Sequence, residues 1–534
     1  MGSMRSSRVV AGILVSLGVL TCAGAYEVFA RAEEEPSPPA AVPVATTTVA
    51  SATPTAESFV REGPDRNATT TIGTCDEARR KGTERFTLAH FNDLQARYSD
   101  RLAGRSRYAY IAGYLRQLKK DVPSTLVLDA GDDYEKGAIA EVRSMGETTR
   151  RMVQALPIDV RTIGNHDFAY GEAAVLRDAR LSAHPVLAAN VRHADLADDE
   201  QPFRPFVRID IGCVKVGIIG LVTQNFGADD RPTSDPYDHV FFHDDRYARI
   251  LEREVKAHRD EVDVLIALTH LGYFEDSRIA MLPSSRGVDL FVGAHTEDLL
   301  RTPVSVGRPG GTRSWIVQAG HFGLTLGRAD FAFDHQTNKL RLERYRIVDV
   351  DASLPMAEDV AALAEDLERG AAPTTHTPVG KARKEITVGS PMTALVARAA
   401  KDTLKTDALL LGRDLFWTNL PRGPITLQRM YEAMLSQRQP AGTAGFSSLW
   451  TVHLSGRELE ALRRRALGNA RYELVAPKRI DPSARYCLAL DKRAVTYSRS
   501  LFGVTLPEAT FGGELIDVLE RYAIARTAQG EALD

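Results

Sequence analysis

The sequence has few cysteines and almost no excess charge of either sign. Its four cysteines are far apart in 534 residues, which excludes a disulfide-stapled fold and a zinc-ribbon motif. The 67 basic and 70 acidic residues nearly cancel. The chain as a whole therefore has no field that would attract a nucleic acid polymer or an anionic membrane. Any affinity for an anion must come from a local site.

The N-terminus contains a long apolar run that follows two basic residues. Arg5 and Arg8 precede "VVAGILVSLGVLTCAGAY", which ends in small residues. This layout predicts an export signal over residues 1–25. The run is nearly long enough to span a bilayer, so an uncleaved anchor is the alternative, and a lipidated Cys22 is another. In each case we expect a periplasmic, cell-surface or secreted protein that contacts a membrane only through its N-terminus.

Residues 26–83 are rich in Pro, Ala, Thr, Ser and Glu. Such a segment buries too little apolar surface to offset the entropy lost on ordering, which predicts a disordered linker. Beyond Cys22, the three cysteines that remain are Cys75, Cys213 and Cys487. One disulfide could form among them, with Cys75 as a candidate partner. Cys213, in "GCVKVGIIGLV", is expected to be a buried strand residue.

Residues 84–350 alternate short apolar runs with amphipathic segments. The runs "TLVLDAG", "VRTIGN", "HPVLAAN", "KVGIIGLV", "VLIALTHLG", "VDLFVGAH" and "SWIVQAG" predict buried strands. The segments "YAYIAGYLRQLKKD" and "RYARILEREVKAHRDE" predict helices. Strands that alternate with helices are typical of a layered α/β domain.

Polar side chains closely follow these apolar runs and the earlier run "RFTLAH", which also predicts a strand. They are Asp93, Asp132, Asn165 with His166, His270, and His295 with Glu297. The carboxyl ends of strands in α/β sheets meet at one crevice. Carboxylates and imidazoles gathered there would repel each other or lose hydration unless cations neutralised them. Each motif alone is weak, but the ordered set predicts a metal site.

The motifs Asp93, "GDD", "GNHDF", "LTHLG" and "GAHTE" resemble those of the calcineurin-like metallophosphoesterases. The spacing, with "LAAN" and "QAGHFGLTLGRADF", is similar to that of the 5'-nucleotidase branch. The resemblance implies a layered β-sandwich flanked by helices, then a smaller α/β C-terminal domain.

The resemblance also implies roles for individual residues. Asp132 would bridge two divalent metal ions, and His166 would be the catalytic acid or a group that stabilises the transition state. One ion would be completed by Asn165, His270 and His295. The other ion would be completed by Asp93, Gln95 and Glu297.

Three positions depart from the family pattern: Gln95 stands where His is usual, Glu297 where Gln or His is usual, and Ala169 where Asp is usual. The second metal site would then have only oxygen ligands, which suit Mn, Mg or Ca. The imidazole ligands of the first metal site suit Zn or Fe. Alternatively, Gln95 points away and that site is empty. Without an Asp at position 169, we expect His166 to lack its usual acidic partner and to be held less firmly, and catalysis to be slowed. The adjacent Asp167 is not expected to replace that partner.

A helical linker over residues 351–380 is expected to lead into residues 381–534, which resemble the C-terminal domain of 5'-nucleotidases. Thr426 and Ser455 are expected to be helix N-caps. The substrate residues of the family are absent: "GRDLFWTNLP" replaces the Asn-Gly-Gly stretch, and Trp417 stands where Arg is expected. Candidate substrate-binding residues are Arg413, Phe416, Trp417 and Phe502, although the aromatic residues could instead be packing residues.

These observations favour an exported dinuclear-metal phosphoesterase that hydrolyses a small-molecule phosphomonoester, with a 5'-nucleotide as the first candidate. The alternative is a weak or inactive ligand-binding protein on the same scaffold, because function follows the site rather than the fold. A third interpretation keeps the metals and changes the bond, to another ester or a sulfur compound. Nothing in the sequence implies an oligomer.

Overall fold

The structure is a computed structural model that describes residues 70–76, 79–135, 137–197, 200–223, 240–242, 246–307, 313–434 and 447–534. The expected export signal lies outside the described residues. In the described part, no helix is both long and apolar enough to cross a membrane. The linker expected over residues 26–83 ends earlier than the sequence indicated, because Thr70–Ile72 form a strand that pairs with Ile209–Ile211.

Two β-sheets packed face to face form the first part of the fold. The six-stranded sheet has the order β17-β16-β2-β5-β6-β7, and the seven-stranded sheet β1-β9-β10-β12-β13-β15-β14. The first contains β2 (Thr83–Phe91), β5 (Thr125–Asp129), β6 (Val160–Thr162), β7 (Val186–Leu187), β16 (Thr325–Asp334) and β17 (Lys339–Asp349). The second contains β1 (Thr70–Ile72), β9 (Phe206–Ile211), β10 (Val214–Val222), β12 (Val264–His270), β13 (Leu290–Val292), β14 (Val304–Gly307) and β15 (Arg313–Val317).

An apolar core fills the space between these sheets. Leu88 and Leu128 enter it from the six-stranded sheet, and Ile218 and Ile266 enter it from the other. The strands β2, β5, β6 and β7 are parallel, as are β10, β12, β13 and β15. Parallel strands that are buried on both faces consist of consecutive apolar residues, and for this reason they could be predicted from the sequence.

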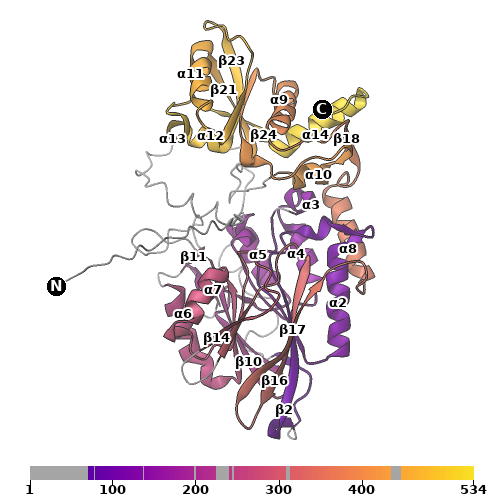
Figure 1. The fold of residues 1–534 in the computed structure, drawn as a ribbon, viewed down its shortest axis with the longest axis vertical. Helices are drawn as coiled ribbons and strands as arrows, with labels where there is room; N and C mark the ends of the chain where they lie inside the picture. The colour runs from indigo at the N-terminus through magenta and orange to yellow at the C-terminus, as the bar shows by residue number, and fades with distance from the viewer. Residues whose placement is uncertain are drawn as a thin grey trace, which may run out of the picture. The chain divides into compact units, whose positions relative to one another are not determined.

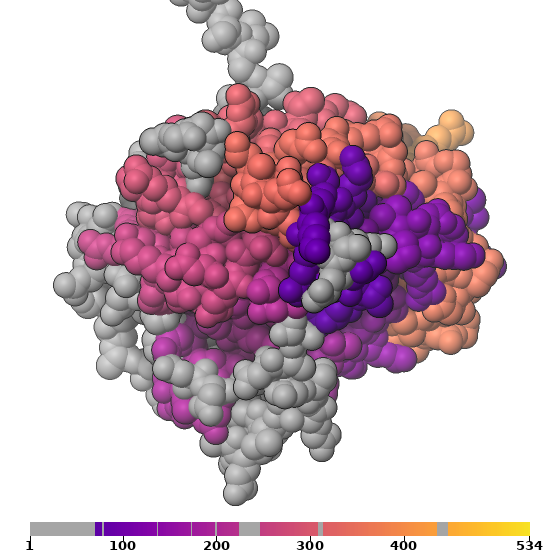
Figure 2. Space-filling model, turned by 90° about the horizontal axis from the view of Figure 1, so that it is seen from below, coloured from indigo at the N-terminus to yellow at the C-terminus, as the bar shows by residue number. Residues whose placement is uncertain are grey.

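Helices cover the outer face of each sheet. The helices α2 (Arg107–Asp121) and α8 (Glu358–Ala371) pack on the six-stranded sheet, and α6 (Tyr247–His258) and α7 (Tyr273–Ala280) pack on the seven-stranded one (Figure 1). In Figure 2, the indigo β2 region lies beside the orange region of the β16–β17 hairpin, in line with the pairing of β2 with β16. Shorter elements are β3 (Arg101–Leu102), β4 (Arg105–Ser106), β8 (Val191–His193), β11 (Val240–Phe242), α3 (Ile139–Arg143), α4 (Glu147–Gln154) and α5 (Glu172–Leu181).

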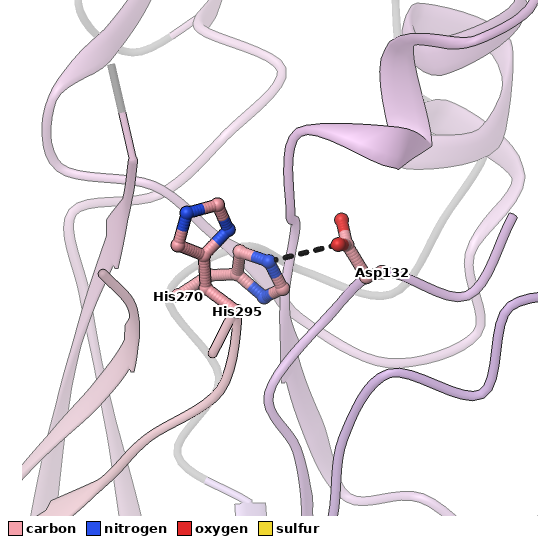
Figure 3. A group of neighbouring side chains, drawn as sticks. All are labelled: Asp132, His270 and His295. Carbon is pink, nitrogen blue, oxygen red and sulfur yellow. Dashed lines mark ion pairs between the residues drawn. The ribbon is translucent and has the colours of Figure 1, made fainter. Parts of the chain in front are cut away.

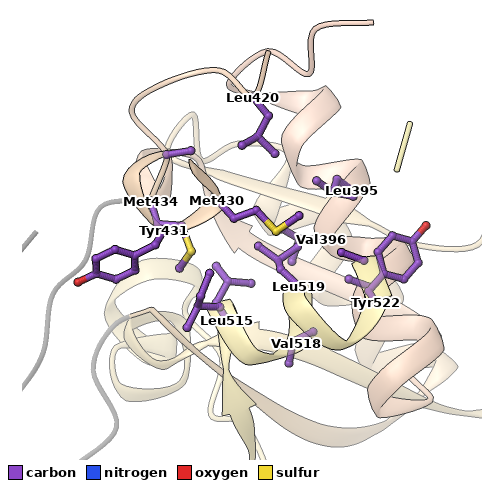
Figure 4. Packing of buried hydrophobic residues seen from close by; sticks show 14 of the residues in the cluster. Leu395, Val396, Leu420, Met430, Tyr431, Met434, Leu515, Val518, Leu519 and Tyr522 are labelled. Carbon is purple, nitrogen blue, oxygen red and sulfur yellow. The ribbon is translucent and has the colours of Figure 1, made fainter. Parts of the chain in front are cut away.

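The C-terminal part has its own sheet of order β22-β19-β23-β21-β24. Its strands are β19 (Ala408–Gly412), β21 (Ser448–Ser455), β22 (Tyr472–Val475), β23 (Arg485–Asp491) and β24 (Thr510–Glu514), with β18 (Pro378–Ala382) and β20 (Gly423–Thr426) in a separate pair. Its helices are α9 (Ser390–Leu404), α10 (Leu427–Glu432), α11 (Gly456–Ala466), α12 (Lys492–Thr496), α13 (Ser498–Phe502) and α14 (Leu515–Ala528). Figure 4 shows one of its two cores, in which α14 packs against α9 and α10.

The layered α/β architecture expected from the sequence is confirmed. The seven apolar runs become β5, β6, β7, β10, β12, β13 and β15, and the two amphipathic segments become α2 and α6. Thr426 caps α10, and Ser455 forms a reciprocal capping box with Glu458. Cys213 is buried as expected, but it lies in the turn between β9 and β10 rather than in a strand, and it forms a disulfide with Cys75.

A buried arginine joins the elements that lead to the crevice. Arg161 of β6 is 1% exposed, and its guanidinium lies 2.6 Å from Asp167, 2.7 Å from Asp133 and 2.6 Å from Asp178. Asp129, its cross-strand neighbour on β5, is 3.8 Å away. Burial raises the pKa values of the Asp129, Asp133 and Asp167 carboxyls, and Arg161 opposes that rise. The Arg161 guanidinium thus holds four acidic side chains from three segments in place.

The disulfide predicts a measurable contribution to stability. The bond closes a loop with a sequence separation of 138 residues. Removing it with Cys75→Ser/Cys213→Ser should lower the free energy of unfolding by about 2–4 kcal/mol, because the unfolded chain regains conformational freedom. Urea unfolding measures this, and Cys487→Ser, at a free thiol, is the control. Equal stability of the double variant and the native chain would contradict the prediction.

Removing the charge of Arg161 should lower the free energy of unfolding by more than removing the disulfide does. Arg161→Met keeps much of the side-chain volume but removes the charge that the four aspartates face. We expect a loss of about 3–5 kcal/mol in unfolding free energy, because a broken buried ion pair leaves uncompensated charge. Arg116→Met is the matched control, since its pair with Asp359 is solvent-exposed and such pairs contribute less than about 1 kcal/mol. A loss no larger than the control's would refute the role of Arg161.

Candidate metal centre

Strand ends place the polar side chains that the sequence singled out. Asp93 follows β2, Asp132 follows β5 and Asn165 follows β6. From the other sheet, His270 is the last residue of β12, and His295 follows β13. The carboxyl ends of parallel strands from both sheets therefore contribute to one place in the fold.

The first half of the centre contains one carboxylate, two imidazoles and one amide. Asp132, His270 and His295 each offer a ligand atom, and these atoms lie within 4.8 Å of one another (Figure 3). The His270 Nε2 atom is 3.0 Å from Asp132 Oδ2, and its Nδ1 is 2.8 Å from the Ala130 carbonyl oxygen. That carbonyl oxygen accepts a hydrogen bond from Nδ1–H, which leaves Nε2 directed at the centre. The Asn165 Oδ1 atom lies 2.9 Å from His295 Nδ1.

A glycine allows this close approach. A Cβ atom on Gly164 would lie 2.0 Å from Asp132 Oδ1 and 2.6 Å from His270 Cε1. Any other residue would displace one of these side chains, so the Gly of "GNHDF" is required by packing. The Gly164 and Asp132 amides both donate to Asp167 Oδ2, at 2.8 and 2.9 Å. Asp167 therefore faces the Arg161 cluster and positions both loops.

The second half of the centre is richer in oxygen. Asp93 Oδ2 accepts hydrogen bonds from the His295 amide at 3.2 Å and from Asn92 Nδ2 at 2.6 Å. The Gln95 amide donates to Glu297 Oε1 at 3.1 Å, so Gln95 faces the centre rather than pointing away. The other Glu297 oxygen lies 3.3 Å from Nδ1 of His321, a residue that the sequence analysis had not assigned to the site.

Backbone strain is concentrated in these loops. Five of the expected ligands have positive φ angles although they are not glycine: Asp93 (52°), Gln95 (44°), Asp132 (59°), His295 (74°) and Glu297 (57°). Residues with side chains adopt this region at an energetic cost, and such residues cluster at functional sites. The surrounding hydrogen bonds must hold these loops in a conformation that the local sequence does not favour.

The buried carboxylates of the centre carry negative charge that a cation would offset. Burial raises the pKa of the Asp93 carboxyl, and the nearby Asp132 and Glu297 carboxylates raise it further. Burial acts in the same direction on Asp132, but the His270 and His166 imidazoles outweigh it and lower its pKa. Asp93 Oδ1 and Gln95 Oε1 are buried and receive no hydrogen bond from any described residue. Such acceptors are costly unless something satisfies them, and a divalent cation fits this donor set.

His166 has an acidic partner that the sequence analysis missed. Its backbone amide donates to Asp132 Oδ1 at 2.7 Å, and its Nδ1 lies 2.5 Å from Glu135 Oε2. The Asp that is usual at position 169 is absent, as the sequence shows, but Glu135 supplies a carboxylate to His166 from another loop. Glu135 comes from the loop after β5, and its own φ of 69° is positive. Its sequence signal was an additional acid three residues after Asp132 in "GDDYEKG".

The four candidate substrate-binding residues do not form one group. Phe416 is 5% exposed and Phe502 is 4% exposed, and they belong to different cores. Neither ring therefore offers a free face on which a base could stack, and the alternative of packing residues describes both. Arg413 lies 3.4 Å from Glu473, also in the C-terminal part.

Trp417 is the member of this group that lies beside a metal-centre loop. Its ring is 40% exposed and lies 6.4 Å from the Phe322 ring, centroid to centroid. The Arg97 guanidinium lies 4.2 Å from the Phe322 centroid and 6.0 Å from that of Trp417. Phe322 in turn donates its amide hydrogen to the Asp93 carbonyl at 2.7 Å. An aromatic and cationic group thus adjoins the Asp93 loop.

Parts of this chain are similar to known proteins in sequence and in fold. Residues 86–297 match the calcineurin-like phosphoesterase family. A snake venom 5'-nucleotidase of Gloydius brevicauda is 31% identical over 290 residues, which cover 49% of this chain and 47% of that protein. The chain therefore spans about half the length of the curated relatives that it matches.

Two solved structures share the fold over most of the chain. A 5'-nucleotidase precursor of Thermus thermophilus has a TM-score of 0.61 at 20% identity, over 83% of this chain and 96% of that one. The sulfate thiohydrolase SoxB of the same organism has a TM-score of 0.56 at 20% identity, over 84% and 94%. At these identities the likeness establishes architecture alone. Residues 86–297 of the chain form a calcineurin-like phosphoesterase domain.

Proposed function

We propose that this chain is an exported, metal-dependent phosphoric ester hydrolase that acts on a small-molecule phosphomonoester. The observation that supports it most is the meeting of Asp132, His270 and His295 at the ends of strands from two sheets. The names of its relatives make a 5'-nucleotide the first substrate to test. The N-terminal sequence supports export to the periplasm, the cell surface or the medium.

In this proposal, Asp132 would help to hold two divalent ions, and Asn165, His270 and His295 would complete the ligands of one of them. Asp93, Gln95 and Glu297 belong to the other. When bound, a pair of divalent ions stabilises charge on a phosphoryl group and lowers the pKa of water. The chain's own residues fix where that happens: Gly164 permits the close approach of Asp132 and His270, and the strained loops leave ligand atoms little freedom.

His166 is the proposed acid that protonates the leaving oxygen. Its side chain is 17% exposed, so a substrate can reach it, and its Nε2 lies 3.9 Å from Asp132 Oδ2. Glu135 Oε2 accepts a hydrogen bond from His166 Nδ1–H, which fixes one tautomer and turns Nε2 toward the crevice. A partner of this kind matters because an imidazole must be held in reach of the atom to which it gives its proton.

Replacement of Asp132 tests the metal-dependent activity. Asp132→Asn keeps the shape but removes the charge shared by both proposed ions. Hydrolysis of AMP or p-nitrophenyl phosphate should fall at least about 1,000-fold, and the metal content per chain should fall with it. Activity assays with Mn²⁺, Zn²⁺, Mg²⁺ and Ca²⁺ and elemental analysis measure both, and chelation of the native chain should abolish activity reversibly. Asp351→Asn, in an exposed turn, is the control.

Two results would count against the proposal. Full activity of Asp132→Asn would exclude the metal centre as the active site. Binding of a nucleotide by the metal-loaded native chain, with no turnover of any phosphoester in the assay panel, would favour the ligand-binding alternative.

The pairing of Glu135 with His166 gives a second prediction. Glu135→Ala should lower kcat about 10- to 100-fold with little change in KM, because the imidazole loses its orientation but the ligands remain. Adding Ala169→Asp should recover much of the loss, since position 169 follows His166 by one short helical turn. Ala169→Asp alone is the control. A Glu135→Ala variant with native kcat, or a loss that Ala169→Asp leaves unchanged, would assign Glu135 no part in positioning His166.

A further inference from the structure

His321 lies beside the oxygen-rich half of the centre. Its Nδ1 is 3.3 Å from Glu297 Oε2, and the Gln95 amide occupies the other oxygen of that carboxylate at 3.1 Å. Glu297 therefore stands between an amide and an imidazole. Gln95 is 1% exposed, whereas the His321 and Glu297 side chains are 34% and 29% exposed, so this contact lies between the interior and the mouth of the site.

The backbone around His321 is bonded to the loop that contains Asp93. On one side, the Ala319 amide donates to Asn92 Oδ1 at 2.9 Å, and Asn92 Nδ2 donates to the Gly320 carbonyl at 2.5 Å. On the other side, the Phe322 amide donates to the Asp93 carbonyl at 2.7 Å. His321 is thus fixed from both sides against the residues of the second half-site.

A simple ion pair between His321 and Glu297 does not account for all the polar atoms present. Asp93 Oδ1, Gln95 Oε1 and His321 Nδ1 are all buried, and none has a hydrogen-bond partner among the described residues. In the described structure, neither Asp93 nor Glu297 forms an ion pair with a lysine or arginine. Buried acceptors in such a group are usually satisfied, and one divalent cation would satisfy several of them together.

We propose that His321 is a ligand of the second metal ion and supplies the imidazole that Gln95 cannot supply. This inference rests on the proposed function, and it replaces the oxygen-only second site expected from the sequence. A set of three carboxylates (Asp93, Asp132 and Glu297), one amide and one imidazole suits Mn, Fe or Zn better than Ca, which prefers oxygen alone. The loss of a histidine from one loop is offset by a histidine from another.

Metal binding by the full chain tests this inference without reference to turnover. The native chain, stripped of metal and titrated with Mn²⁺ or Zn²⁺ by calorimetry, should bind two ions. His321→Ala should keep the first ion and weaken the second at least about 10-fold. When loaded with Co²⁺, the His321→Ala variant should absorb less visible light than the Co²⁺-loaded native chain. The control is His453→Ala, which removes an exposed imidazole from β21.

A rescue variant separates a ligand from a packing residue. His321→Ala/Gln95→His returns an imidazole from the neighbouring loop, so it should restore tight binding of the second ion. Thermal unfolding of each metal-free variant shows whether the fold is retained. Rescue supports the proposal, since a loss caused by misfolding would persist in the double variant.

The outcomes distinguish this inference from the function on which it rests. A second ion that binds His321→Ala with native affinity would overturn the inference and leave the hydrolase proposal in place, as would a loss that Gln95→His cannot rescue. A native chain that binds only one ion would also overturn it. Two ions, with the second lost in His321→Ala, would support it even if no phosphoester were hydrolysed.

Discussion

The contact on which the rest of this structure depends is the buried pairing of one arginine with four aspartates. Arg161 draws Asp129, Asp133 and Asp167 from two strand ends and Asp178 from a helix into one cluster. Asp167 then accepts the amides of Asp132 and Gly164. A buried cluster of this kind contributes less to net stability than its charges suggest, because desolvation opposes the attraction. Its effect is geometric: it fixes two strained loops relative to each other.

Two of the three departures from the family pattern, at Gln95 and Ala169, share a structural feature. At two positions a familiar side chain is missing, and at each the structure provides a similar group from another loop. Glu135 meets His166 where Ala169 offers no carboxylate, and His321 meets Glu297 where Gln95 offers no imidazole. The chemistry of a site depends on which atoms meet, so a substitution at one position does not by itself show that an enzyme has lost its function.

Much of the fold could be predicted because its strands and helices have strong local signals. The buried parallel strands are continuous apolar runs, α2 and α6 are amphipathic, and Thr426 and Ser455 are good N-caps. Predictions were weaker where the signal is not local. Thr70–Ile72 become a strand only because β9 offers an edge and a disulfide holds Cys75 nearby. Phe416 and Phe502 have the composition of a binding surface but are buried in separate cores.

The sequence by itself determined the class of the fold and the main candidate ligands, because each ligand lies at or just after the end of a recognisable strand. These residues are Asp93, Asp132, Asn165, His270 and His295. Only the tertiary structure decided the partners of these residues. Glu135 and His166 are 31 positions apart, and Glu297 and Gln95 are 202 apart. Contacts across such distances depend on the register and twist of two packed sheets and on positive φ angles in their loops, which no local pattern encodes.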